Sequence, residues 1–333
     1  MFEPPFKTVL KPYGQALVEL ATARPEVLCL SGDLTKQCEI DLFQDRLPQQ
    51  FVHAGMAEAN MMSMAGSLAR QGFIPFVHTF GVFATRRPFD QVVNAIAYPN
   101  LPVRIVGFMP GLSSPGGPSH QAIEDVALMR ALPNMTVIDV ADAAQTRAVL
   151  PAIVDHPGPV YLRLKRGEIP VIFDEDRFSL TEVETLVTGD DVLLISSGMM
   201  LPAALSAVTT LRDAGVSAGL LNVPVIKPLD SDGILRAARP AGAVVTVENH
   251  SIIGGLGSAV AETMAEAGLG IPLRRIGIPD TFGEGAKSGP YLFEKYGLTT
   301  QHILDAAWSA LGRGGRAPRA RAVTVEAGEY APV

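Results

Sequence analysis

The feature that most constrains this 333-residue chain is a regular alternation of short apolar runs with segments of helical apolar spacing. Runs rich in β-branched and aromatic residues predict strands, and apolar residues recurring every three to four positions predict helices. In the first half, the predicted strands are 26–31, 51–53, 73–78, 103–107, 135–139 and 159–166, and the predicted helices are 13–23, 61–70, 86–97, 122–131 and 143–154. Strands that alternate with helices predict a parallel sheet covered on both faces.

The alternation begins again after a segment rich in Gly, Pro and acidic residues. The second set of predicted strands is 191–196, 217–222, 243–247 and 273–277, with helices at about 201–213, 229–238, 255–268 and 300–311. We therefore expect an α/β fold with two doubly wound parallel-sheet domains, at 1–170 and 190–312, joined by a linker at 171–189. The tail 313–333 is rich in Arg, Gly, Pro and Ala, which predicts an exposed extension.

Composition limits the class of protein. Hydrophobic residues make up 47% of the chain and the net charge is −7, which fits a soluble globular enzyme and argues against nucleic acid as a main partner. Cys29 and Cys38 are too few for a disulfide framework or a cysteine-rich metal site, so two reduced thiols are expected. The first residues lack the order of a signal peptide, and no apolar run is long enough to span a bilayer; a cytoplasmic location is expected.

One carboxylate stands alone in a stretch of small and apolar residues. Glu58 precedes the run 61–70, which is rich in Met and Ala, and the next acidic residue is Asp90. A helix this poor in charge is expected to be buried in a core or a subunit contact. A buried carboxylate must be neutral or hydrogen-bonded, because an unpaired charge is costly there. Taken alone, the pattern also fits a glutamate that a backbone group satisfies.

Four motifs, the first of which contains Glu58, occur in order along the chain, and together they carry a resemblance to a known family. They are Gly55-x-x-Glu58, Thr79-Phe80-x-x-Phe83, Asp90-Gln91 and Gly117-Pro118-Ser119-His120-Gln121. In this order they resemble the pyrimidine-binding half of transketolases, and the chain is most similar to the second subunit of short bacterial split transketolases. The resemblance covers nearly the whole chain and implies a pyrimidine-binding domain at 1–170 and a transketolase C-terminal domain at 190–312.

The resemblance implies a thiamine diphosphate enzyme that transfers a two-carbon ketol unit from a ketose to an aldehyde. Glu58 matches the glutamate that shares a proton with the aminopyrimidine ring and so activates the coenzyme. Phe80 and Phe83 match the positions that stack on that ring, and their spacing places both on one side of a helical turn. Arg86 stands where larger transketolases have a third aromatic, and it is expected to stack there or to face the partner subunit. Asp33 matches a carboxylate beside the thiazolium side, although it could equally cap the next segment.

Three more residues are assigned to the substrate. His120 follows a Gly-Gly-Pro-Ser loop and matches the substrate-channel histidine, which can donate to a developing alkoxide or relay a proton. Arg166 matches an arginine that receives the substrate phosphate, and guanidinium groups suit phosphate oxygens. Phe108 lies where the family carries a histidine that binds the donor sugar.

Two departures predict an altered substrate. Phe108-Met109 replaces the usual His-Ala or His-Asp pair, and Pro115-Gly116-Gly117 replaces Glu-Asp-Gly. The missing His and Asp side chains ordinarily hydrogen-bond hydroxyls of the donor sugar. If those hydroxyls were buried without these hydrogen-bond partners, the site would lose several kcal/mol of discrimination in favour of the hydroxylated sugar. We therefore expect a less hydroxylated, branched or otherwise unusual ketose or 2-oxo compound.

The anchor for the coenzyme's diphosphate is missing from the sequence. The family pattern binds Mg²⁺ and the diphosphate through Gly-Asp-Gly and a later Asn, and no Gly-Asp-Gly occurs in this chain. The resemblance therefore implies a large partner subunit that supplies both, in an α2β2 heterotetramer, and no metal ligand is expected in this chain. The segment Glu248-Asn249-His250, before Gly254-Gly255-Leu256-Gly257, matches a structural segment at the family's dimer contact, so His250 is not assigned a catalytic role.

Two alternatives stay open at this point. The beta subunit of a 2-oxo acid dehydrogenase decarboxylating component has the same two-domain plan and the same activating glutamate, but usually an Ala-Gln-His-Ser-type loop. A non-catalytic pseudo-subunit would have no need to retain Glu58, Phe80, Phe83 and His120.

Overall fold

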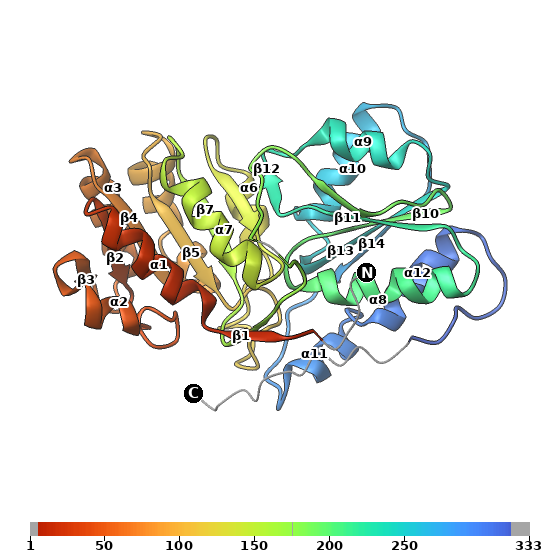
Figure 1. Ribbon diagram of the computed structural model, residues 1–333, viewed down its shortest axis with the longest axis horizontal. Coiled ribbons are helices and arrows are strands. Elements are labelled where there is room, and N and C mark those ends of the chain that lie inside the picture. The colour runs from red at the N-terminus through yellow and green to blue at the C-terminus, as the bar shows by residue number, and fades with distance from the viewer. Residues whose placement is uncertain (1–5, 175, 321–333) are drawn as a thin grey trace.

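A computed structural model describes residues 6–174 and 176–320, which form two α/β units side by side (Figure 1). The strands are β1 (Thr8–Leu10), β2 (Val27–Ser31), β3 (Phe51–His53), β4 (Ile74–Phe80), β5 (Arg104–Phe108), β6 (Thr136–Asp139), β7 (Val160–Leu164), β8 (Glu168–Pro170), β9 (Glu184–Val187), β10 (Val192–Ser196), β11 (Ala218–Asn222), β12 (Val225–Lys227), β13 (Ala243–Ser251) and β14 (Leu273–Ile278). The α-helices are α1 (Pro12–Ala23), α2 (Asp41–Arg46), α3 (Glu58–Arg70), α4 (Gly81–Thr85), α5 (Phe89–Gln91), α6 (Asp125–Arg130), α7 (Ala143–Val154), α8 (Leu201–Asp213), α9 (Ser231–Ala238), α10 (Leu256–Glu266), α11 (Gly289–Lys295) and α12 (Thr300–Ala310). Three other helical segments are the 3₁₀-helices η1 (Pro48–Gln50) and η3 (Gly198–Met200) and the π-helix η2 (Val92–Ala97).

The first unit is built on a seven-stranded sheet in the order β12-β6-β7-β5-β4-β2-β3. All six strands from the first half run parallel, as the alternation predicted. Helices α1 and α7 cover one face through apolar residues such as Leu17 and Ile153. Helix α3 and segment η2 cover the other face, where Met61 and Ile96 are fully buried. The charge-poor run after Glu58 is thus helical and packs on the sheet.

The second unit has a five-stranded sheet in the order β14-β13-β10-β11-β9. Helices α8 and α12 pack on one face and α9 and α10 on the other, each through a separate apolar cluster. The expected class, two α/β domains with parallel sheets flanked by helices, is confirmed.

The structure adds four short strands that periodicity did not predict. Strand β9 lies within the segment expected as a linker and pairs antiparallel with β11. Strand β12 leaves the second unit and pairs antiparallel with β6 at the edge of the first sheet. Strands β1 and β8 form a two-stranded antiparallel sheet beside the first unit (Figure 1). A strand of three or four residues is too short to show a period, so pairing with a tertiary partner decides whether it forms.

Two further predictions need adjustment. The helix expected at 86–97 is two segments, α5 and η2, because the preceding helix α4 ends at Thr85 and Pro88 cannot continue it. In the expected tail, Ala320 N donates to Gln301 Oε1 at 2.9 Å, and Gln301 Nε2 donates to Pro318 O at 3.3 Å. Residues 313–320 therefore pack along α12, and residues 321–333 lie outside the described part.

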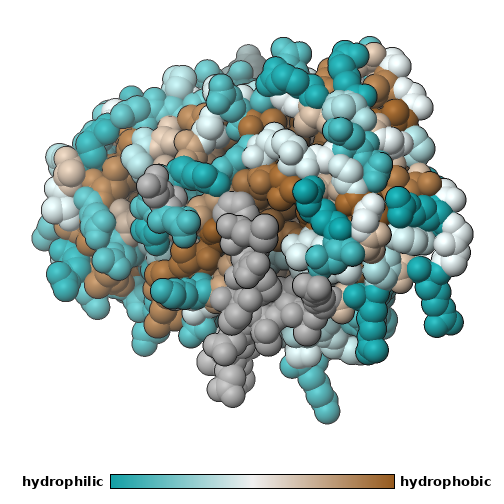
Figure 2. Space-filling view, turned by 45° about the vertical axis from the view of Figure 1, so that its right-hand side comes forward, coloured by the Kyte–Doolittle hydropathy of each residue, from teal (hydrophilic) through white to brown (hydrophobic). Residues whose placement is uncertain are grey.

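Hydrophilic side chains cover much of the face shown in Figure 2, with hydrophobic surface gathered towards its middle.

A buried arginine joins the two units. Arg163, at the end of β7, is 1% exposed. It donates to Asp125 Oδ2 at 2.9 Å, to Asp139 Oδ2 at 2.7 Å and to the carbonyl of Asn249, in the second unit, at 3.0 Å. Tyr161 also donates to Asp125, at 2.6 Å. One guanidinium thus binds two carboxylates of the first unit and a backbone group of the second.

We expect Arg163→Met to destabilise the folded protein by about 3–5 kcal/mol, because two buried carboxylates would lose their cation. The measurement is chemical denaturation followed by circular dichroism. The control is Arg130→Met, whose partner Glu262 is exposed, with an expected loss below about 1 kcal/mol. Equal stability of the two variants would contradict a central role for Arg163.

Candidate functional site

The candidate residues lie where parallel strands of the first sheet end. Asp33 follows β2, Phe80 is the last residue of β4, and the loop that carries His120 follows β5. In a doubly wound sheet, the crevice beyond the carboxyl ends of the strands is the usual ligand site.

Glu58 is the first residue of α3 and is 4% exposed. Gly55 has a φ of +72°, a conformation that favours glycine and turns the chain between β3 and the helix. The carboxylate Oε1 accepts a hydrogen bond from Arg87 Nη1 at 2.7 Å, and the Arg87 side chain is half exposed. The hydrogen-bond partner of this buried carboxylate is therefore the long side chain of Arg87, which is half exposed at the surface.

An aromatic wall stands beside this ion pair. The rings of Phe80 and Phe83 are stacked, with centroids 5.8 Å apart and planes at 22°. The His120 imidazole meets Phe83 edge-on at 5.3 Å. The guanidinium carbon of Arg87 lies 4.0 Å from the centre of the Phe83 ring. Arg87 thus links Glu58 to the wall, and the structure brings together four residues that the sequence had singled out.

Arg86 points elsewhere, although it is adjacent in sequence to Arg87. Its guanidinium donates to both Glu124 carboxylate oxygens and to the carbonyls of Pro118 and Gln121. In these contacts the residue clamps the loop that carries His120. The expectation that Arg86 stacks on the coenzyme or faces the partner subunit stays a prediction. These contacts raise the pKa of Arg86, with Glu124 as the main cause.

The loop that presents His120 is also held by the second unit. Asn249 donates to Pro110 O at 3.0 Å and accepts from Leu112 N at 3.0 Å. Gln121 donates to Ser114 O and to Glu284 O, at 3.0 and 2.9 Å. His120 itself is partly exposed, and its Nδ1 lies 2.9 Å from Ser119 Oγ. The imidazole is therefore presented on a loop fixed at both ends.

Asp33 lies on the exposed rim after β2. It has a φ of +68°, and its Oδ1 is 3.4 Å from His53 Nε2. Both side chains are about half exposed. They remain available to a group that approaches from solvent or from another chain.

Arg166 lies beside a buried acid that the sequence did not single out. Glu39 is 2% exposed, and its Oε1 accepts from Gly167 N at 2.6 Å, while Oε2 has no hydrogen-bond partner. Burial raises the pKa of Glu39 to about 7, and the charges of Lys11 and Arg166 oppose the shift. Arg166 is thus placed next to a carboxyl group that can be neutral or charged near neutral pH.

Phe108 does not face the crevice. Its ring is fully buried and meets the Tyr13 ring edge-on, with centroids 5.6 Å apart. The following residue, Met109, is 4% exposed. The Phe108 side chain belongs to the apolar core of the first unit, and its contact with a substrate stays a prediction.

A buried histidine under the site was also missed by sequence reasoning. His78 Nδ1 lies 3.1 Å from Leu30 O, and Nε2 lies 2.7 Å from the Tyr13 hydroxyl. The ring nitrogen that faces a carbonyl must donate, so the other nitrogen accepts from Tyr13. Burial lowers the pKa of His78 to about 4, which keeps the ring neutral. A histidine inside an apolar strand was the one available signal.

His250 is structural in the described contacts. Its Nδ1 donates to Ser251 O at 2.7 Å and its Nε2 accepts from Ala127 N at 3.3 Å. Its neighbour Glu248 accepts from Leu256 N and Gly257 N at the start of α10. Glu248 therefore anchors the start of α10 within the Gly-Gly-Leu-Gly segment.

Within residues 6–174 and 176–320, no group of three or more His, Cys, Asp or Glu side chains could hold a metal ion. In the same residues, no helix combines the length and the hydropathy that a membrane crossing requires.

Comparison with protein families gives two matches that follow the two units. The family described as transketolase, pyrimidine binding domain, matches residues 7–171. The family described as transketolase, C-terminal domain, matches residues 181–303.

Individual relatives match over most of the chain. A transketolase family protein, y4mN, of Sinorhizobium fredii is 45% identical, over 88% of this chain and 86% of the relative. The 6-deoxy-6-sulfo-D-fructose transketolase subunit SqwH of Clostridium sp. is 42% identical, over 89% of this chain and 92% of the relative. The 1-deoxy-D-xylulose-5-phosphate synthase of Microcystis aeruginosa is 32% identical, and the match spans 90% of this chain but 48% of that enzyme.

A solved structure described as a split gene transketolase, inactive beta4 tetramer, superposes with a TM-score of 0.84 at 43% identity, covering 91% of this chain and 97% of that one. Together with the two domain matches and the relatives, this likeness establishes that the chain belongs to the transketolase family, as a split-type subunit with the pyrimidine-binding and C-terminal domains.

Proposed function

We propose that this chain is the small subunit of a two-component thiamine diphosphate-dependent transketolase that moves a two-carbon ketol unit from a ketose to an aldehyde. The observation that carries the proposal is the buried Glu58 carboxylate beside the stacked rings of Phe80 and Phe83. The coenzyme, when bound, supplies a carbanion to the reaction. Domain 1–170 receives the aminopyrimidine end of the coenzyme, and domain 190–312 supports the loop that carries His120.

Glu58 would hold a proton at the ring nitrogen of the aminopyrimidine. The carboxylate is almost excluded from water, so a hydrogen bond made there is stronger than at the surface. Phe80 and Phe83 offer a flat apolar surface against which a planar heterocycle can stack. The residues present therefore fit the pyrimidine end of the coenzyme.

Arg87 makes both contacts that this ring would need. Its guanidinium is a planar group that donates to Glu58 and lies over the Phe83 ring. A planar heterocycle with a hydrogen-bonding edge cannot take the same position at the same time. We infer that Arg87 turns away when the coenzyme enters, which its half-exposed side chain permits.

His120 would donate a proton or hydrogen bond to a substrate oxygen. Its Nδ1 is beside Ser119 Oγ, which leaves Nε2 available to a ligand. Arg166 would receive a phosphate or another anionic group of the substrate, and Asp33 would lie near the coenzyme's other ring.

The substrate would differ from that of common transketolases. Phe108 and Met109 are buried apolar residues and offer no donor to a sugar hydroxyl, and Gly116 has no side chain to offer. The Clostridium relative acts on a ketose with a sulfonate, 6-deoxy-6-sulfo-D-fructose, so donors other than the common ones occur in the family. We propose an unusual ketose that carries an anionic group, tested with a panel of ketose phosphates and sulfonates.

A partner subunit would complete the site. No metal-binding group occurs among the described residues, and the chain has no Gly-Asp-Gly anchor. A large subunit would hold Mg²⁺ and the diphosphate in an α2β2 assembly. The similar split-gene structure, a beta4 tetramer, is described as inactive, which supports dependence on a partner.

The decisive test replaces the carboxylate by its amide. In the reconstituted complex, we expect Glu58→Gln to slow the exchange of the coenzyme C2 proton for deuterium at least about hundredfold, because the ring loses its proton partner. Nuclear magnetic resonance measures this exchange without knowledge of the substrate. Glu262→Gln, a change at an exposed ion pair, serves as the control and should exchange at the normal rate. Normal exchange in Glu58→Gln would overturn the proposal.

A second test addresses Arg87. We expect Arg87→Ala to lower the coenzyme concentration that half-saturates the complex by about tenfold, because no ion pair must then be broken. Tryptophan fluorescence or calorimetry gives the value. Arg70→Ala, at the exposed end of α3, should leave it unchanged. A rise in the half-saturating concentration would mean that Arg87 contributes to coenzyme binding.

A further inference from the structure

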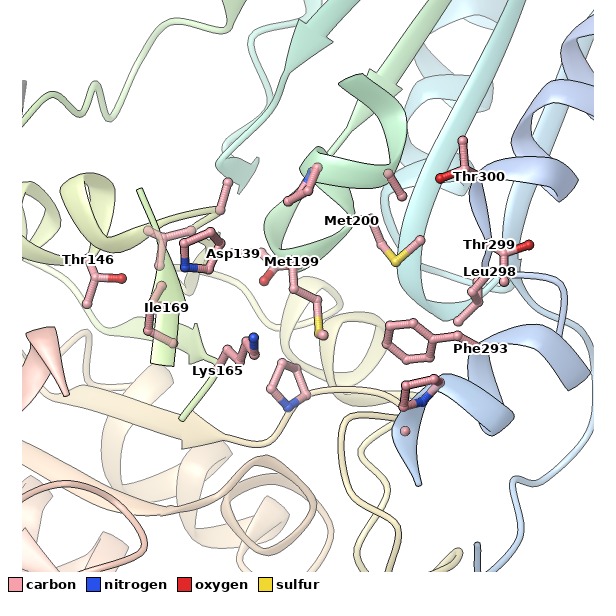
Figure 3. Close-up of a pocket in the computed structure, with 18 residues that line it drawn as sticks. Asp139, Thr146, Lys165, Ile169, Met199, Met200, Phe293, Leu298, Thr299 and Thr300 are labelled. Atoms are coloured by element: carbon pink, nitrogen blue, oxygen red, sulfur yellow. The ribbon is translucent and has the colours of Figure 1, made fainter. Parts of the chain in front are cut away.

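A cavity of about 300 Å³ lies between the two units, away from the crevice described above. The first unit contributes Lys165, Ile169 and the residues that follow β6, and the second contributes Met199, Met200 and Phe293 (Figure 3). This volume is at the lower end of the range of pockets that bind small organic molecules.

The cavity is separate from the candidate coenzyme site. Its lining includes none of Glu58, Phe80, Phe83 and His120. Lys165 lines it, while the charge of the next residue, Arg166, acts to lower the pKa values of Cys38 and Glu39, which are not part of the lining. Consecutive residues of an extended chain point in opposite directions, which explains the separation.

The cavity wall is mostly apolar, and Lys165 is the positively charged residue in its lining. In Figure 3 the amine of Lys165 lies near Met199, with the Phe293 ring on the opposite wall. The hydrogen bond described for the amine goes to the Glu168 carbonyl, at 3.3 Å. Desolvation lowers the pKa of Lys165, the charge of Glu168 opposes that shift, and the side chain is partly exposed.

The carboxylate of the lining is already engaged. Asp139 Oδ2 accepts from Arg163 Nη1 at 2.7 Å and from Ser197 Oγ at 3.3 Å. It is therefore committed to the buried cluster that joins the units. An ammonium group that faces an apolar chamber is stabilised by an anion able to accept its free N–H bonds.

We propose that this cavity binds a small organic acid, whose carboxylate pairs with the Lys165 amine and whose apolar body packs against Met199, Met200 and Phe293. Such a ligand satisfies both the charge and the apolar surface. Because the walls come from both units, its binding also stabilises their arrangement. This proposal is independent of the coenzyme site.

Octanoate is the probe, and thermal unfolding of the full chain is the measurement. Octanoate should raise the melting temperature in a concentration-dependent manner, because a ligand that binds only the folded state stabilises it. The uncharged analogue 1-octanol should bind at least about tenfold more weakly, since it lacks the charge-assisted hydrogen bond. Equal effects of the two compounds, or no effect of octanoate at millimolar concentration, would overturn the proposal.

Variants test the two parts of the site. Lys165→Met should weaken octanoate binding at least about tenfold and Lys165→Arg should retain it, while Lys36→Met, at an exposed lysine, should bind normally. Ala203→Leu adds volume to the cavity wall and should reduce binding of both compounds. Unchanged octanoate binding in Lys165→Met, or in Ala203→Leu, would place the ligand elsewhere and refute the assignment.

Discussion

The contact of Arg163 with Asp125 and Asp139 is the interaction on which the rest of the structure depends. Removing three charged groups from water is costly, and only close pairing compensates. The geometry provides it, with N–O distances of 2.7 and 2.9 Å and further hydrogen bonds from Tyr161 and Ser197. The cluster fixes where the first sheet meets the second unit.

The loop that carries His120 depends on this junction. Asp125 is the first residue of α6, directly after the loop that carries His120. Asn249 binds Arg163 through its backbone carbonyl, and its side chain donates to Pro110 at the start of the same loop. Arg86 fixes the end of the loop through Glu124. His120 is thus positioned by contacts from both units, which a pyrimidine-binding domain alone would lack.

Glu58 is held differently. Its partner is Arg87, a half-exposed side chain that can leave, while the helix behind Glu58 is packed firmly on the sheet. A buried acid with a removable partner can be kept satisfied in the free subunit and then exchange that partner for a ligand.

By itself, the sequence determined the two α/β units, and its resemblance to transketolases singled out Glu58, Phe80, Phe83 and His120. Strand and helix periods specify which face of an element is buried, and parallel strands bring their carboxyl ends together, so motifs after successive strands meet. Only the tertiary structure decided that Arg87 pairs with Glu58 while Arg86 clamps a loop, that Phe108 points into the core, and that β12 crosses to the first sheet. Those outcomes depend on contacts between residues distant in sequence and on the direction of single side chains, and neither leaves a periodic trace in the chain.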